Sequence, residues 1–494
     1  MSTITLTRTP GVTRLDYDLL RRAALVFAIA NLLLAPLMVD PLAYAGGAAT
    51  PWVLLRIIGT PTMPAAAAYL FLWQWMQVFA RILQAQIDGE SLGAGIHGAN
   101  VTRAYWYMLT SLVVLAVTFR VTLSGLRPAS YAEAVAHERW RPADLIIVYV
   151  GAIAISLAFA FAGRLVPPLF QAMDVASRLK IVALFVLCAY TFSTGQGMKF
   201  MLGAVFFEIL VGFTGFFSDF RGVFIYVAVA AIASRIRWST MSSIAAVVWV
   251  SMLLVLALFW TSVKNDYRIY ASQSEESQEI KVPLSERMAY LGDKLTSADG
   301  IDWSDAAYTL LVRLAYVDIF GAVIGVQEAS PEPEPYRQWS EAFGHVFQPR
   351  FLFPDKPQLL DSDVYMRLAR SDPAEHARVG TSISVGYMGE NFADLGFPGM
   401  LFGIAFMGVM LGLVTRFFIS SHLPLMVREA IVMGFIFSMA RDGVEVSLPK
   451  VLGGMFMFFL VFSLLAKFGF PIVIRWLDTR AAEARAKALP SARP

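Results

Sequence analysis

The chain has 494 residues, of which 57% are hydrophobic and only 16% are charged, and its formal net charge is +3. Soluble domains carry about 25% charged residues, and apolar runs of about 20 residues recur along this chain. The composition therefore excludes a soluble globular enzyme and predicts a polytopic membrane protein. A single cysteine, Cys188, and five scattered histidines exclude an internal disulfide and a zinc cluster. We expect no metal and no cofactor, although a divalent ion held by carboxylates alone stays open.

The polar stretch Met1–Arg22 has no cleavable leader pattern, which predicts an uncleaved cytoplasmic tail. Apolar spans are expected after it near 23–39, 62–82, 104–124, 143–163, 179–194, 198–217, 222–238 and 241–262. A long polar segment follows, and further spans are expected near 397–418, 427–442 and 450–471. The predicted fold is an all-α polytopic membrane protein with 11–12 transmembrane helices and one large external loop between the eighth and ninth spans.

Charge predicts the orientation of the chain. The C-terminal tail and the Arg235/Arg237 turn are basic and favour the cytoplasm, whereas 263–396 is acidic and is expected outside. Eleven spans would leave the basic N-terminus outside, so either a twelfth span is hidden or one was divided wrongly, within Thr50–Thr60 or within 179–217. The expected organisation is an N-terminal transmembrane bundle (1–262), a large periplasmic loop (263–396), and C-terminal transmembrane helices with a basic cytoplasmic tail (397–494).

Two local patterns predict how helices pack. Asp305–Gly325 is nearly apolar but is interrupted by Arg313 and Asp318, which predicts an amphipathic helix near 305–325 that lies on the membrane or roofs the bundle; a true span is the alternative. Gly399/Gly403 and Gly408/Gly412 form two G-x-x-x-G pairs inside one predicted span, a pattern typical of close helix packing.

Charged residues from distant segments are expected on the outer side of the membrane. Charges inside a bilayer cost about 2.5–3.5 kcal/mol each on insertion scales, so these residues mark candidate chemistry. Guanidinium groups suit a diphosphate through paired donors, and a carboxylate suits a general base. The candidates are Arg221, Arg441 and Glu390 as catalytic residues, and Arg350, Lys356, Arg313 and Asp394 as substrate-binding residues.

Each candidate also has a structural explanation. Arg221 and Arg441 can pair with Asp219 and Asp442 or extend to lipid headgroups. Glu390 and Asp394 can stabilise the N-terminus of a helix. Lys356, in P-D-K-P, can be a solvated turn residue.

Three motifs together resemble a known family. They are F-S-D-F-R-G-V at 217–223, R-F-L-F-P-D-K-P at 350–357, and G-Y-M-G-E-N-F-A-D-L-G-F-P-G at 386–399, the last leading into a span. This arrangement resembles the bacterial O-antigen polymerases, the Wzy-type oligosaccharide repeat-unit polymerases. The resemblance implies a glycosyltransferase fold of the C type in the bacterial inner membrane. It also implies transfer of a growing glycan from undecaprenyl diphosphate to a new lipid-linked repeat unit at the periplasmic face, in O-antigen (lipopolysaccharide), capsule or exopolysaccharide synthesis.

The same resemblance suggests roles and partners. Arginines at the outer face would hold the diphosphate, and Glu390 would be the acid of the glycine-rich segment. The implied partners are an undecaprenyl-diphosphate-linked oligosaccharide, the lipid bilayer, a chain-length regulator and a flippase, with no nucleic acid. The alternatives are an O-antigen ligase-like glycan transferase, a lipid-linked glycan flippase or transporter, and a non-enzymatic assembly partner. Glutamate in place of the histidine motif of the ligases favours the polymerase.

Overall fold

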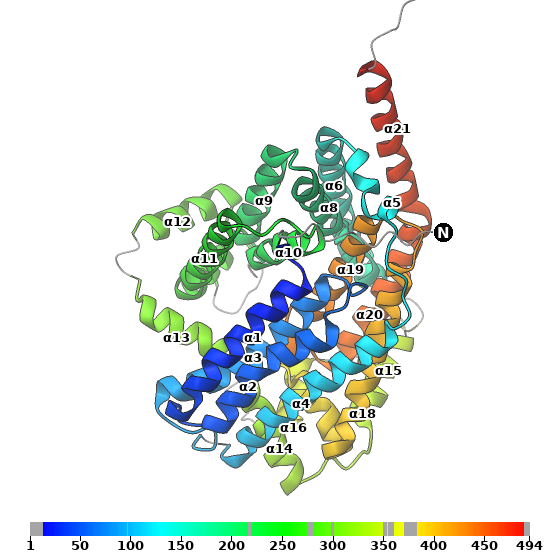
Figure 1. Ribbon diagram of the computed structural model, residues 1–494. Coiled ribbons are helices and arrows are strands. Elements are labelled where there is room, and N and C mark those ends of the chain that lie inside the picture. Colours follow the sequence, from blue (N-terminus) through cyan, green and yellow to red (C-terminus); the bar gives the residue numbers. More distant parts are fainter. Residues whose placement is uncertain are drawn as a thin grey trace, which may run out of the picture.

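The computed structural model describes residues 13–95, 97–215, 219–274, 280–297, 301–348, 353, 360–369 and 383–488. These residues form helices, joined by turns and by one isolated β-bridge between Arg14 and Arg237 (Figure 1). The predicted all-α class is therefore confirmed.

Within the described ranges, seven helices are long and apolar enough to cross a membrane, and the bent pair Trp303–Leu314 and Val317–Ala329 would be an eighth if it forms one span. The seven are α1 with its 3-10 extension (Tyr17–Leu37), α4 (Ala99–Thr122), α6 (Pro142–Leu165), the segment ending in α8 (Pro167–Thr194), α11 (Thr240–Ser272), α18 (Gly386–Ile419) and the continuous helix through α20 and α21 (Leu448–Lys487). A polytopic helical membrane protein is thus what the chain encodes.

Shorter or more polar helices complete the bundle. They are α2 (Pro41–Ile58), α3 (Ala66–Asp88), α9 (Met198–Phe213), α10 (Phe220–Ala233) and α19 (Leu425–Ala440). Every predicted apolar span coincides with a helix. α2, which packs against α1, α3 and α4, was not among these spans, although Thr50–Thr60 was named as a place for a hidden one. Buried side chains of α3 and α19, among them Phe71, Val78, Met433 and Phe435, form the centre of the core.

The start of α1 lies beside two turns from later in the chain. The Leu15 N–H donates to the Ile236 carbonyl (2.9 Å), and the Trp238 N–H donates to the Thr13 carbonyl (2.8 Å). The Tyr17 hydroxyl donates to the carbonyl of Pro64, in the turn between α2 and α3 (2.7 Å). The N-terminal end of α1 and the C-terminal end of α2 therefore share the end of the bundle that carries the Arg235/Arg237 turn.

Short helices gather after α11, which continues to Ser272 beyond the predicted boundary at 262. They are α12 (Leu284–Thr296), α13 (Trp303–Leu314), α14 (Val317–Ala329), α15 (Arg337–Phe347) and α16 (Asp361–Ala369).

The helix predicted near 305–325 is two helices, α13 and α14, which meet at a 42° bend. The backbone leaves the helical conformation at Ala315, which is extended, and the second helix begins at Val317, so the expected single helix is interrupted. Arg313 is exposed, whereas Asp318 forms an ion pair with Arg81 of α3 (2.8 Å). α14 packs on α4 and α18 and buries Phe320 and Val323.

α18 is bent at Gly396, whose φ of 59° is a left-handed conformation that glycine adopts without strain. Beyond the bend, α18 packs closely on α4. A Cβ added at Gly412 would lie 2.6 Å from the Thr122 Cβ, and Gly408 lies against Thr118 in the same way. The predicted close packing is confirmed for Gly408/Gly412. Gly403 instead makes room for the Asn391 and Trp339 side chains.

Candidate functional site

Three of the predicted arginines come together at the end of the bundle opposite the N-terminus. Arg221 is in the first turn of α10, Arg313 is in the last turn of α13, and Arg441 directly follows α19. The positive charges of Arg441 and Arg313 both act on the Arg221 guanidinium. We call these three residues the arginine cluster. Segments more than two hundred residues apart in the sequence thus supply one cationic surface.

The arginines of this cluster differ in their partners. Arg441 forms an ion pair with Asp219 (3.5 Å), the residue expected to pair with Arg221. Within the described part of the chain, Arg221 and Arg313 form neither an ion pair nor a hydrogen bond, and both are exposed. Two guanidinium groups therefore present their donors to solvent beside a third. A guanidinium offers five N–H donors in a planar fork, which suits a bidentate oxyanion.

Asp219 and Asp442 act on Arg221, and a further carboxylate, that of Glu445, lies near Arg221 and Arg313. Glu445 lies in the turn between α19 and α20, where Gln77 of α3 holds it by donating from Nε2 to its Oε1 (3.1 Å). Gln77 also accepts the Val444 N–H (2.8 Å), so the turn is fixed at two points. Burial, with a smaller contribution from the Asp442 carboxylate, raises the pKa of Glu445 to about 7, whereas Arg313 and Arg221 oppose the shift.

Glu445 was not among the predicted candidates. Its signal in the sequence is the clustering of Arg441, Asp442 and Glu445 in one short turn between two apolar helices. α11 extends the cationic surface, because the charge of Arg313 also acts on Lys264 and Arg268.

Glu390 lies in a different environment. Its side chain is 1% exposed, and its Oε2 accepts the Leu448 N–H (2.7 Å) at the start of α20. Among the described residues, its Oε1 has no hydrogen-bond partner. The charged groups acting on it include Asp361, Asp394 and Arg367. Glu390 therefore caps a helix, as one interpretation of the sequence expected, but the helix is α20 rather than its own.

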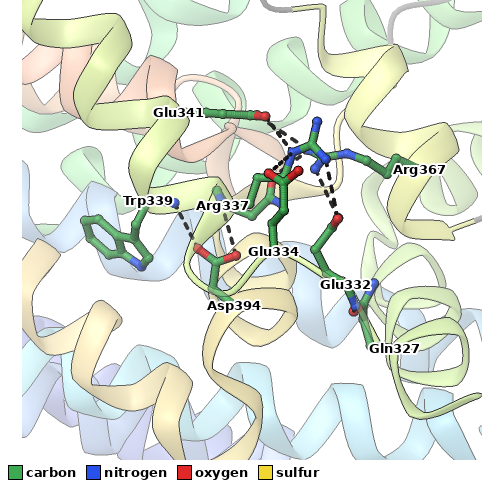
Figure 2. A network of polar contacts seen from close by, with 9 residues as sticks. Gln327, Glu332, Glu334, Arg337, Trp339, Glu341, Arg367 and Asp394 are labelled. Carbon is green, nitrogen blue, oxygen red and sulfur yellow. Dashed lines mark hydrogen bonds and ion pairs between the residues drawn. The ribbon is translucent and has the colours of Figure 1, made fainter. Parts of the chain in front are cut away.

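Asp394 also caps a helix. Its two oxygens accept the Gln338 N–H (3.1 Å) and the Trp339 N–H (2.9 Å) at the start of α15, and Figure 2 shows the contact between Asp394 and Trp339. Beside it, Glu332 is only 5% exposed and pairs with Arg367 (3.0 Å), while Arg337 pairs with Glu341 (2.8 Å). This polar network ties α15, α16 and α18 together, and both Asp394 oxygens are occupied within it.

The remaining candidates, Arg350 and Lys356, lie outside the described residues. Within the described ranges, no group of three or more His, Cys, Asp or Glu side chains is arranged to hold a metal ion. No family model, no curated protein and no solved structure matches this chain.

Proposed function

We propose that this protein is a membrane glycosyltransferase, a polymerase that moves a growing glycan from undecaprenyl diphosphate to a new lipid-linked repeat unit at the periplasmic face. The observation that supports this most is the convergence of Arg221, Arg313 and Arg441 at one end of a membrane bundle. A lipid diphosphate is an anion at the bilayer surface, and exposed guanidinium groups bind such oxyanions through paired donors. The motifs shared with the O-antigen polymerases point to the same substrate.

The proposal includes twelve membrane crossings. They are α1, α2, α3, α4, α6, α8, α9, α10, α11, α18, α19 and α20. The hydrogen bonds between Thr13–Leu15 and Ile236–Trp238 support it, because they join the N-terminus to the basic turn. Both termini are then cytoplasmic, the arginine cluster faces the periplasm, and α2 is the hidden twelfth span.

The proposed reaction balances without a cofactor. The acceptor hydroxyl oxygen attacks the anomeric carbon of the donor, the bond from that carbon to the diphosphate oxygen breaks, and undecaprenyl diphosphate leaves with the bonding electrons. The arginine cluster stabilises the charge that develops on the leaving diphosphate. The hydroxyl proton passes to a carboxylate. We assign that role to Glu445, because it lies near Arg221 and Arg313 without an ion pair among the described residues, whereas Asp219 pairs with Arg441. Glu390 is kept as the alternative base.

Matched glutamine variants test the base. We expect Glu445→Gln to abolish long polymer at normal expression and Glu390→Gln to retain it. Polymer length on gels reads both. Long chains from Glu445→Gln, with none from Glu390→Gln, would transfer the role to Glu390; long chains from both would refute a carboxylate base at either position.

A charge-conserving change tests diphosphate binding. Arg221→Lys keeps the positive charge but loses the planar fork, so we expect shorter polymer and weaker donor binding. Arg120→Lys, on α4, is the matched control. Unchanged activity in Arg221→Lys would argue against bidentate binding there.

The transporter alternative has one observation in its favour, the 42° break between α13 and α14, because broken helices line the substrate sites of many transporters. Purified protein in detergent separates the classes. A polymerase lengthens lipid-linked units without a sealed membrane, a ligase-like enzyme makes single transfers to another acceptor, and a transporter makes no product.

A further inference from the structure

A second cationic site lies at the opposite end of the bundle from the arginine cluster. A groove of about 1080 Å³ opens where α18 ends, between the turn leading to α19 and the junction of α20 with α21. Its volume slightly exceeds the roughly 300–1,000 Å³ of ordinary ligand pockets. The segments that form it end two membrane spans, so the groove lies where apolar helix meets the basic face of the protein.

Basic side chains of this groove have no acidic counterpart in its lining. Arg416, Lys467 and Arg475 line it, and its lining contains no aspartate or glutamate among the residues that the structure describes. Arg416 is held in place because its Nη1 donates to the carbonyls of Thr122 and Ser124 (2.8 Å each). Lys467 and Arg475 are exposed. The groove is thus complementary to an anion.

The rest of the lining is largely apolar, and its other polar members are His422 and several serines. Leu413, Phe417 and Leu464 are 47%, 47% and 56% exposed, so about half of each side chain is uncovered. The lining also contains the Ser421 hydroxyl, which is buried and has no hydrogen-bond partner within the described ranges. A ligand with one anionic polar group and an apolar body would contact both kinds of surface.

A π-helical turn at Leu465–Gly469 shapes this site. The Phe470 N–H donates to the Leu465 carbonyl five residues earlier, and Pro471 has no N–H to continue the α-helical pattern. The extra residue shifts the helix register at Lys467. The π-helical turn, which the proline at 471 favours, therefore accounts for the position of Lys467 in the groove lining.

We propose that this groove binds one anionic phospholipid of the cytoplasmic leaflet. Its headgroup phosphate contacts Lys467, Arg475 and the fixed Arg416, and its acyl chain lies along Leu413, Phe417 and Leu464. Anionic lipids of this leaflet are attracted to basic segments at the ends of spans, and pockets between spans bind their headgroups. The site is independent of the proposed glycan chemistry, because it lies at the other end of the bundle, but its place in the cytoplasmic leaflet rests on the proposed twelve-helix topology.

Binding of short-chain phosphatidylglycerol to the purified full-length protein in detergent tests this proposal. We expect phosphatidylglycerol to bind and to raise the unfolding temperature, and phosphatidylcholine with the same chains to do neither. One basic side chain near an anionic surface contributes about fivefold in affinity, so the double variant Lys467→Gln/Arg475→Gln is expected to bind roughly thirtyfold more weakly. The control Arg485→Gln/Lys487→Gln removes the same charge from exposed positions of the same helix and is expected to bind normally.

Several results would overturn the proposal. Equal losses in the two double variants would mean general surface attraction, and no loss in either would mean that the groove is not the site. Stabilisation by inorganic phosphate alone to the same extent would mean that a free anion, not a lipid, is the ligand. If the groove variant fails to fold, Ser420→Trp occludes the groove with its charges intact; lost binding there supports the proposal and retained binding refutes it.

Discussion

At the scale of single residues, the candidate site depends on which carboxylate lies near the arginines. Glu445 is partly buried in the turn beside Arg221 and Arg313, whereas Glu390 is buried against the start of α20. Burial disfavours a carboxylate anion, and a neighbouring guanidinium favours it. At Glu445 burial prevails and raises the pKa to about 7, which is a suitable value for a group that accepts a proton near neutral pH.

This shift predicts how anion binding at the arginine cluster depends on pH. Below about pH 7 Glu445 is neutral; above it, the ionised carboxylate opposes a bound anion. Binding of inorganic pyrophosphate should therefore weaken by about 1 kcal/mol, or fivefold, as pH rises through 7. Since the folded-state pKa is raised, the stability contributed by protonated Glu445 is likewise lost as pH rises through that value. The groups that face Glu445 are Asp442, Gln77, Arg313 and Arg221.

Titration calorimetry at pH 6 and pH 8 measures the effect. Glu445→Gln cannot ionise, so the ratio of wild-type to variant affinity removes the titration of pyrophosphate itself. A ratio that is the same at both pH values would contradict the assignment.

Asp394 is expected to affect stability rather than substrate binding. Its two oxygens accept two N–H groups at the start of α15, and losing such a cap costs about 0.5–2 kcal/mol. Asp394→Ala should lower thermal stability by this amount, and Asp363→Ala, at an exposed position of α16, should not. If Asp394→Ala has normal stability but binds the lipid-linked donor more weakly, Asp394 contributes to substrate binding after all.

At the scale of elements, the sequence predicts most helices of the bundle, including the largely buried α8 and α19, but it resolves the region before α3 poorly. The predicted span at 179–194 coincides with α8, whereas α2 was anticipated only in its second half, as a hidden span within Thr50–Thr60. Half of the α2 residues are buried, and Gly47 lies so close to Phe79 that a Cβ there would be 2.6 Å from its ring. The small residues at 45–49 suit a helix enclosed by α1, α3 and α4, but they interrupt the run of large apolar side chains by which a span is recognised.

Part of the candidate site could also be predicted from the sequence, and part of it could not. Charges near span ends are visible in the sequence, so Arg221, Arg313 and Arg441 could be predicted. The separate environments of Glu390 and Glu445 could not, because they depend on how the turn between α19 and α20 folds against Gln77 and α18.

The packing of α18 on α4 makes a prediction for its glycines. Gly412→Ala would place a Cβ 2.6 Å from the Thr122 Cβ, and overpacking of this kind costs about 1–3 kcal/mol. Gly203→Ala, in α9, has no atom within 4 Å and should be neutral or slightly stabilising. Thermal unfolding in detergent compares the two. Equal unfolding temperatures would mean that α4 and α18 move apart to accept the added methyl group without any loss of stability.

At the scale of the whole molecule, the direction of each crossing determines whether the arginine cluster can reach a periplasmic substrate. The hydrogen bonds of Thr13–Leu15 join the N-terminus to the basic turn near Arg235, and Pro64 joins the end of α2 to the start of α1. Twelve crossings satisfy these contacts and also satisfy the basic C-terminal tail.

Cysteine labelling in intact cells tests this arrangement, because the native Cys188 is fully buried and gives a low background. We expect Val39→Cys and Ala329→Cys to react with an impermeant maleimide added outside, and Thr62→Cys and Thr240→Cys to react only after the inner membrane is opened. Val39 and Thr62 flank α2, so this pair decides the number of crossings. If both react from the same side, α2 does not cross and the proposed twelve-helix topology is wrong. If Ala329→Cys reacts only from inside, the arginine cluster faces the cytoplasm, and a periplasmic polymerase is excluded.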